Sequence, residues 1–149
     1  MSITCYHYCT DEFLKELEKK KVIKPSKYVP IEHPTRPSQV IMKKVFIDDN
    51  LNNGYGMFFA WEHPDYQGKV NVVSNSNIRL LELRVPEGEY IETNYREWCD
   101  YALDLFRGNN QTNGSYIFNV NNVQETQYLL RKIKYNWIRD IKVVETKYI

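Results

Sequence analysis

The alternation of hydrophobic and polar residues near the start of the chain predicts a strand followed by a helix. Residues 2–9 alternate β-favouring side chains, which is typical of a strand. Thr10 follows as a predicted N-cap, with two acidic residues in the first turn, where the helix dipole favours anions. Phe13, Leu14 and Leu17 then repeat at helical spacing, and a lysine run ends the predicted helix.

The second half of the chain contains the clearest strand and the clearest helix. Residues 78–85 are predicted as a strand, and residues 89–93 as a second, shorter one. Residues 94–106 repeat apolar side chains at helical spacing. Asn94 is the predicted cap of this helix, and Glu97 holds the capping-box position three residues on.

The remaining pattern predicts more strands than helices. After a proline-rich irregular loop, we expect a turn followed by a strand over 51–61 and two further strands over 115–120 and 126–130. A short helical connection is predicted over 134–141 and a final strand over 142–149. Because strands and helices do not alternate strictly, we expect an α+β fold with a mainly antiparallel sheet and two principal helices. No linker or repeat interrupts residues 1–149, so we expect a single globular domain.

Composition places the chain among globular proteins. It has 149 residues, of which 42% are hydrophobic and 26% charged. No apolar run reaches the ~18 residues of a membrane helix, and no signal peptide is recognisable, so we expect a cytoplasmic protein without membrane contact. A net charge of +1 gives no general attraction to nucleic acid. The enrichment in Asn, Lys, Ile and Tyr is typical of AT-rich bacterial or phage genomes.

The nearest approach to a metal motif is Cys5-x-His7-x-Cys9. On a strand these three side chains share one face, about 7 Å apart between neighbours. A tetrahedral zinc site needs a fourth ligand and usually turns, so we expect no metal here and packed cysteines instead. Cys99 is expected on the inner side of its helix, in a structural role. His7 remains either a hydrogen-bonded strand histidine or part of a ligand site.

Four segments carry a resemblance to known families. "YHYCTDEFLKELEKKKVIKP" (6–25) resembles the opening of bacterial ADP-ribosyltransferase-like domains, in which a strand with a "YHxT" element leads into a helix. "GYGMFFAW" (54–61) is similar to the glycine-flanked aromatic strand of that group, and residues 123–145 are similar to its strand that opens with a catalytic glutamate. Residues 79–103 also resemble a small uncharacterised bacterial family with a "VP…(S/T)(D/N)Y..W" pattern.

The resemblance implies a split sheet that binds NAD or a related nucleotide and transfers ADP-ribose to a macromolecule, either protein or nucleic acid. His7 would hold the ribose, and Tyr55 or Phe58 would stack on nicotinamide. A carboxylate would stabilise the oxocarbenium-like state, with Glu125 and His7 as the candidate catalytic residues. The family's glutamate position falls on Gln127, or on Glu125 if the register shifts by two, and the sequence leaves both open.

Whether the chain is an enzyme is therefore also open. The pyrophosphate would need a cation, and the arginines that could supply it are Arg36, Arg79 and Arg84. The rival hypothesis is a non-catalytic binding or inhibitor protein on the same scaffold, such as a phage-encoded anti-defence protein. The high content of tyrosine and asparagine suits an interaction surface of that kind.

Overall fold

A computed structural model describes residues 1–25, 57–64, 78–106, 118–121 and 125–144, with the backbone alone for the last six residues of the second helix. The described residues form an α+β fold with a mostly antiparallel sheet and two helices, as the pattern of the sequence predicts. The described elements, in chain order, are β1 (Ile3–Thr10), α1 (Asp11–Lys20), β2 (Val22–Ile23), β3 (Phe58–Trp61), β4 (Ile78–Val85), β5 (Tyr90–Asn94), α3 (Tyr95–Phe106), β6 (Thr126–Leu130), β7 (Ile133–Lys134), the 3₁₀ turn η4 (Tyr135–Trp137) and β8 (Ile138–Val144).

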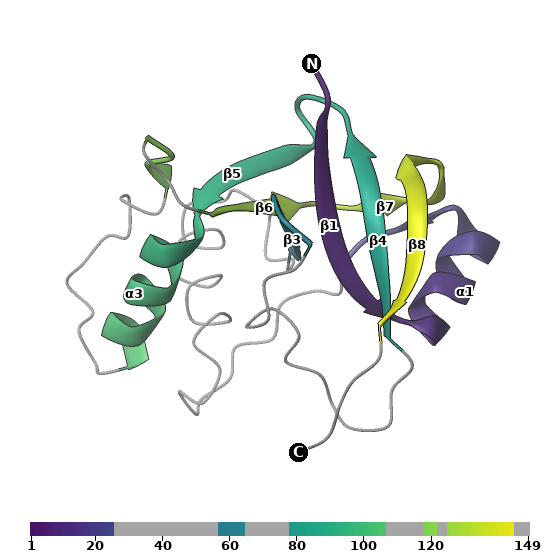
Figure 1. Cartoon of the computed structure of the whole chain (residues 1–149), viewed down its shortest axis with the longest axis horizontal. Helices are drawn as coiled ribbons and strands as arrows, with labels where there is room; N and C mark the ends of the chain where they lie inside the picture. The colour runs from purple at the N-terminus through teal and green to yellow at the C-terminus, as the bar shows by residue number, and fades with distance from the viewer. Residues whose placement is uncertain (26–56, 65–77, 107–117, 122–124, 145–149) are drawn as a thin grey trace.

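Six of these strands form one sheet in the order β5-β6-β3-β1-β4-β8, and β2 pairs with β7 in a separate two-stranded sheet. The longest pairing joins β1 to β4, from Ile3 opposite Val85 to Thr10 opposite Ile78. β1, β4 and β8 run side by side, whereas β5 and β6 run across them, which reflects the strong twist of the sheet (Figure 1). The two helices lie at opposite ends of this sheet (Figure 1).

The helix α1 begins and ends as its sequence dictates. Thr10 accepts a hydrogen bond on Oγ1 from the backbone N–H of Phe13, at 3.1 Å, so the predicted N-cap is confirmed. Lys21 adopts a left-handed conformation with φ of 68°, and its N–H donates to the Leu17 carbonyl at 2.7 Å, which closes the last turn. The chain therefore leaves α1 directly into β2.

The main core lies between α1 and one face of the sheet. Leu17 is fully buried there against Cys5 and Cys9, which point to the same face because side chains alternate along a strand. Phe13 and Leu14 pack against the edge of this cluster, so the predicted apolar stripe of the helix is confirmed. The other members of the cluster come from β3, β4, β6, β7 and η4: Ala60, Leu81, Leu83, Val85, Tyr128, Leu130, Ile133 and Trp137.

The opposite face of the sheet packs against α3. Phe59 and Trp98 meet edge to face at 5.6 Å between ring centroids, and Trp61 meets Tyr95 in the same way at 6.1 Å. All five residues of β6 are buried, because this strand is covered on both faces. Asn94 accepts from the N–H of Glu97 at 3.2 Å, which confirms it as the cap of α3.

Three local predictions are wrong. The final strand begins at Ile138 instead of residue 142, because the single turn of η4 already reverses the chain and Ile138 pairs with Leu83. Of the strand predicted over 115–120, the described residues 118–120 form no strand, since the Asn119 side chain accepts from the N–H of Asn121 and stabilises a turn instead; residues 115–117 lie outside the described ranges. Cys99 is exposed, because α3 turns the face of its neighbour Trp98 toward the sheet.

Candidate functional site

His7 lies on the α1 side of the sheet, beside two aromatic residues. Its ring meets the ring of Phe58 edge to face at 5.8 Å and the ring of Phe13 at 6.0 Å, between centroids. Phe13 and Phe58 also meet each other edge to face, at 5.6 Å. The imidazole is thus one member of a three-ring cluster that joins β1, α1 and β3.

The backbone of β3 fixes the tautomer of His7. Nδ1 lies 2.6 Å from the Phe59 carbonyl oxygen, which can only accept, so Nδ1 carries the proton. Burial lowers the pKa of the imidazole, while the hydrogen bond to that carbonyl acts in the opposite direction. His7 is therefore neutral at pH 7, and Nε2 carries a lone pair without a hydrogen-bond partner among the described residues.

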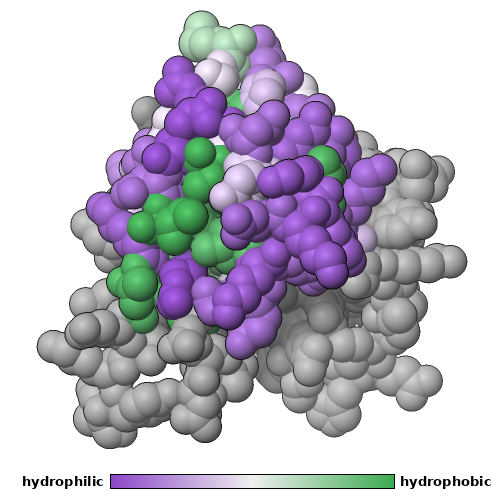
Figure 2. Space-filling view, turned by 90° about the vertical axis from the view of Figure 1, so that its right-hand side faces the viewer, coloured by the Kyte–Doolittle hydropathy of each residue, from purple (hydrophilic) through white to green (hydrophobic). Residues whose placement is uncertain are grey.

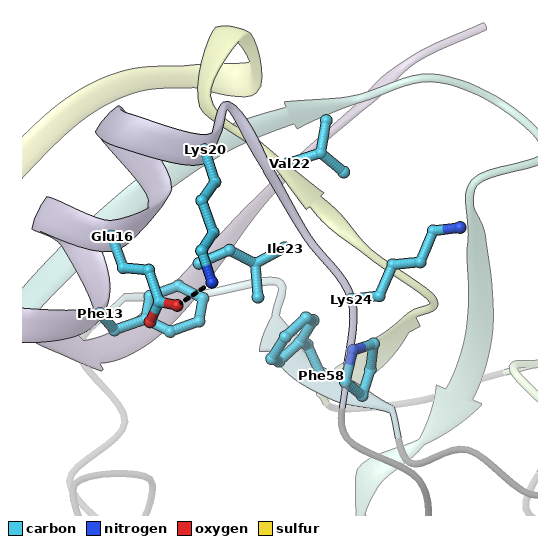
Figure 3. A pocket seen from close by; sticks show the side chains of 8 residues that line it. Phe13, Glu16, Lys20, Val22, Ile23, Lys24 and Phe58 are labelled. Carbon is cyan, nitrogen blue, oxygen red and sulfur yellow. Dashed lines mark hydrogen bonds and ion pairs between the residues drawn. The ribbon is translucent and has the colours of Figure 1, made fainter.

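A pocket of about 500 Å³ opens beside this cluster, between α1, β2 and the start of β3 (Figure 3). Phe13 and Phe58 line it from two sides, and Ile23 lies between them in the view of Figure 3. His7 contacts both phenyl rings, although it is not itself among the described residues that line the pocket. His7 and Phe58, two of the residues expected to bind the nucleotide, are thus in contact, and the His7 ring supports the ring of Phe58.

The pocket also carries charge. Lys20 and Glu16 form an ion pair at 2.5 Å, one helical turn apart on α1. The ammonium of Lys20 turns down beside Phe13, whereas Lys24 extends away from it at the other end of the pocket (Figure 3). Since Glu16 offsets one of the two lysines, the lining is net positive, which favours an anionic ligand with an aromatic part.

Glu125 occupies a different place, just before β6. Its side chain accepts from the backbone N–H of His63 at 3.4 Å and lies 3.9 Å from Nε2 of that histidine. Glu62 completes the group, with a carboxylate oxygen 3.8 Å from Nε2 of His63 and another that accepts from the N–H of Thr126 at 3.2 Å. Of the contacts that the described part of the chain makes with His7, none involves Glu125.

Gln127 also lies away from the His7 pocket. It pairs with Trp61 on one side and Thr93 on the other, so its side chain shares the sheet face that packs against α3. The residue is 1% exposed, and its Nε2 is buried without a hydrogen-bond partner among the described residues. Neither candidate for the catalytic glutamate position therefore joins His7 and Phe58.

The remaining candidate residues of the nucleotide site are Tyr55 and three arginines. Tyr55 and Arg36 lie outside the described residues. Arg79 pairs with Asp11 at 3.4 Å, and Arg84 donates to Ser2 and Thr4 at 2.8 and 3.1 Å, all at the ends of β1. These contacts give both arginines a role in holding the N-terminal strand and its helix.

The three side chains of the Cys5–Cys9 motif share one face, as predicted. Burial raises the pKa of Cys5 to about 12 and, against the opposing influence of Arg79, that of Cys9 to about 12 as well. Metals and electrophiles react with the thiolate, which is scarce at neutral pH when the pKa is this high. Within the described ranges, no three His, Cys, Asp or Glu side chains are grouped so as to hold a metal ion.

Of the residues that line the pocket, only Phe58 was predicted as a site residue, and Phe13, Glu16, Lys20 and Lys24 are among those that sequence reasoning missed. Glu16 and Lys20 stand four residues apart, the spacing of a helical ion pair, but such pairs are common on solvated helix faces. Phe13 belongs to the apolar stripe of α1, a pattern that predicts packing against the core and no contact with a ligand. Only the packing of α1 beside β3 shows that these side chains border a cavity.

No protein-family model, curated protein or solved structure matched this chain. Among the described helices, none is both long enough and apolar enough to span a membrane.

Proposed function

We propose that this protein binds NAD or a related nucleotide in the pocket between α1, β2 and β3. The observation that carries the proposal is the contact of His7 with both Phe13 and Phe58, which holds two aromatic rings at a cavity bordered by lysines. The volume of about 500 Å³ falls within the range of ordinary ligand pockets. An aromatic base or nicotinamide ring would stack on phenyl, and the phosphates would pair with Lys20 and Lys24.

The transfer of ADP-ribose is a further step that needs a carboxylate at the ribose. Glu125, the candidate for that role, contacts His63 and shares no contact with His7. The carboxylate that borders the pocket is Glu16, and it is already engaged by Lys20. We therefore place nucleotide binding, without turnover, ahead of ADP-ribosyl transfer to a macromolecule.

The binding test is calorimetric titration of the protein with NAD. Phe58→Ala should weaken binding about tenfold, because the stacking of one base on one aromatic ring typically contributes about this factor to the affinity. Lys20→Ala should weaken it several-fold through the loss of a phosphate partner. The matched control is Lys15→Ala, which removes an exposed lysine from an equivalent ion pair on α1, with Asp11 at 3.1 Å, outside the pocket.

Two results would contradict the binding proposal: no heat at millimolar NAD, or equal losses for Lys20→Ala and Lys15→Ala. Transfer is tested separately, with labelled NAD and cell extract. Binding without transfer of label is the expected result. Label that reaches a macromolecule and is lost in Glu125→Gln would instead establish the enzyme and its carboxylate.

A further inference from the structure

The last strand of the described sheet, β8, presents an exposed edge. It pairs with β4 on one side and ends the strand order on the other. Residues 139–143 are all exposed, including Ile141 at 42% and Val143 at 69%. The face of the molecule that carries β8 and α1 shows a broken strip of hydrophobic surface bordered by hydrophilic side chains (Figure 2). An exposed edge of this kind is a template for pairing with another strand.

Charge alternates with these apolar residues on β8. Ile141 and Val143 share one face, and Asp140 and Lys142 share the other. Asp140 lies opposite Glu82 of β4, so two carboxylates are neighbours across the sheet. Like charges in such positions are unfavourable. Within the described ranges, neither Asp140 nor Lys142 has an ion-pair partner.

Symmetry restricts how β8 could pair with its own copy. In an antiparallel pair, residues that lie opposite one another share one face of the sheet, and successive residues of a strand alternate between the two faces. A symmetric pair of identical strands must therefore be centred on one residue, which lies opposite the same residue of the other copy. A pair centred on Asp140 would set aspartate against aspartate, and one centred on Lys142 would set lysine against lysine. The pair centred on Ile141 sets Asp140 of each copy opposite Lys142 of the other, and Ile141 opposite itself.

We infer that two copies of this chain associate through antiparallel pairing of β8, centred on Ile141, to form one continuous sheet. Lys142 of the second copy then lies beside Asp140 and offsets its repulsion from Glu82. On the other face, the two Ile141 side chains meet next to Leu81, which is opposite Ile141 on β4 and fully buried. The apolar edge of the single chain becomes a continuation of its core.

The test is the mass of the full chain in solution, measured by sedimentation at about 0.2 mM, where even small interfaces assemble. The unaltered chain should be dimeric. Asp140→Lys and Lys142→Asp should each give a monomer, because each sets like charges opposite one another in the register centred on Ile141. The combined variant restores both ion pairs with reversed sign and should restore the dimer, with thermal unfolding used to check that every variant is folded.

A cross-link tests the centre of symmetry. In a Cys99→Ser background, Ile141→Cys should form an intermolecular disulfide on mild oxidation, because residue 141 faces itself. Val143→Cys is the control, since the two copies of that residue would lie about 13 Å apart, beyond the reach of a disulfide. A monomer at 0.2 mM, dimers that survive both single charge reversals, or equal cross-linking at both positions would each overturn the inference.

Discussion

Replacing Gln127 with methionine should stabilise the protein. Gln127 is 1% exposed, and its Nε2 has no hydrogen-bond partner in the part of the chain that the structure describes, so the folded state carries the desolvation cost of an amide. That cost is about 1–3 kcal/mol, and methionine has a similar length and volume without the polar group. We expect the free energy of unfolding to rise by about 1–2 kcal/mol, which for a chain of this size raises the Tm by about 2–8 °C.

Urea denaturation followed by tryptophan fluorescence measures this change, with thermal unfolding as a second readout. Two neighbouring variants should move the other way. Gln127→Glu keeps the shape but buries a charge, and Thr93→Val removes the hydrogen bond from Thr93 Oγ1 to the Gln127 carbonyl, 2.8 Å long, at a cost of about 1 kcal/mol. A loss of more than 1 kcal/mol in Gln127→Met would refute the reasoning, because it would mean that the amide is well hydrogen-bonded in solution.

Three further predictions concern β1 and α1. Leu17→Ala should lower the free energy of unfolding by about 2–5 kcal/mol, since Leu17 is fully buried, and urea denaturation should show a smaller loss for the half-buried Leu14→Ala. Thr10→Ala should cost about 1 kcal/mol in the same assay, whereas Thr10→Ser, which keeps the capping oxygen, should cost little. Burial lowers the pKa of His7 below its ordinary 6.5, so below that pH the unfolded chain binds the proton more readily. Stability should therefore fall as the pH drops from 6.5, by at most about 1.4 kcal/mol per unit. His7→Gln should flatten this dependence, and an unchanged slope would argue against a partly buried, neutral imidazole.

The elements that could be predicted are those whose signals are local. The strand over Ile78–Val85 and the caps at Thr10 and Asn94 depend on side chains within a few residues of one another. The start of β8 could not be predicted in this way, because it depends on pairing between Ile138 and Leu83, more than fifty residues earlier. The orientation of Cys99 depends likewise on which face of α3 meets the sheet.

The site was harder to predict than the fold. Alternation along β1 places His7 on the same face as Cys5 and Cys9, and that much follows from strand geometry. The positions of Glu125 and Phe58 relative to His7 depend on the order of the strands in the sheet. The alternation of side chains along a single strand gives no information about that order. His7 contacts Phe58, whereas Glu125 lies in a second group with His63.

The central position of β1 has a consequence for how the chain folds. β1 lies between β3 and β4 in the sheet, and its full partner, β4, begins at Ile78 and ends at Val85. β1 therefore cannot complete its pairing on the ribosome until β4, which begins more than sixty residues after β1 ends, has emerged. Pairings between such distant segments raise the contact order, and chains of high contact order fold slowly. We expect folding in the range of milliseconds to seconds, with an N-terminal strand that stays open to other partners until synthesis is well advanced.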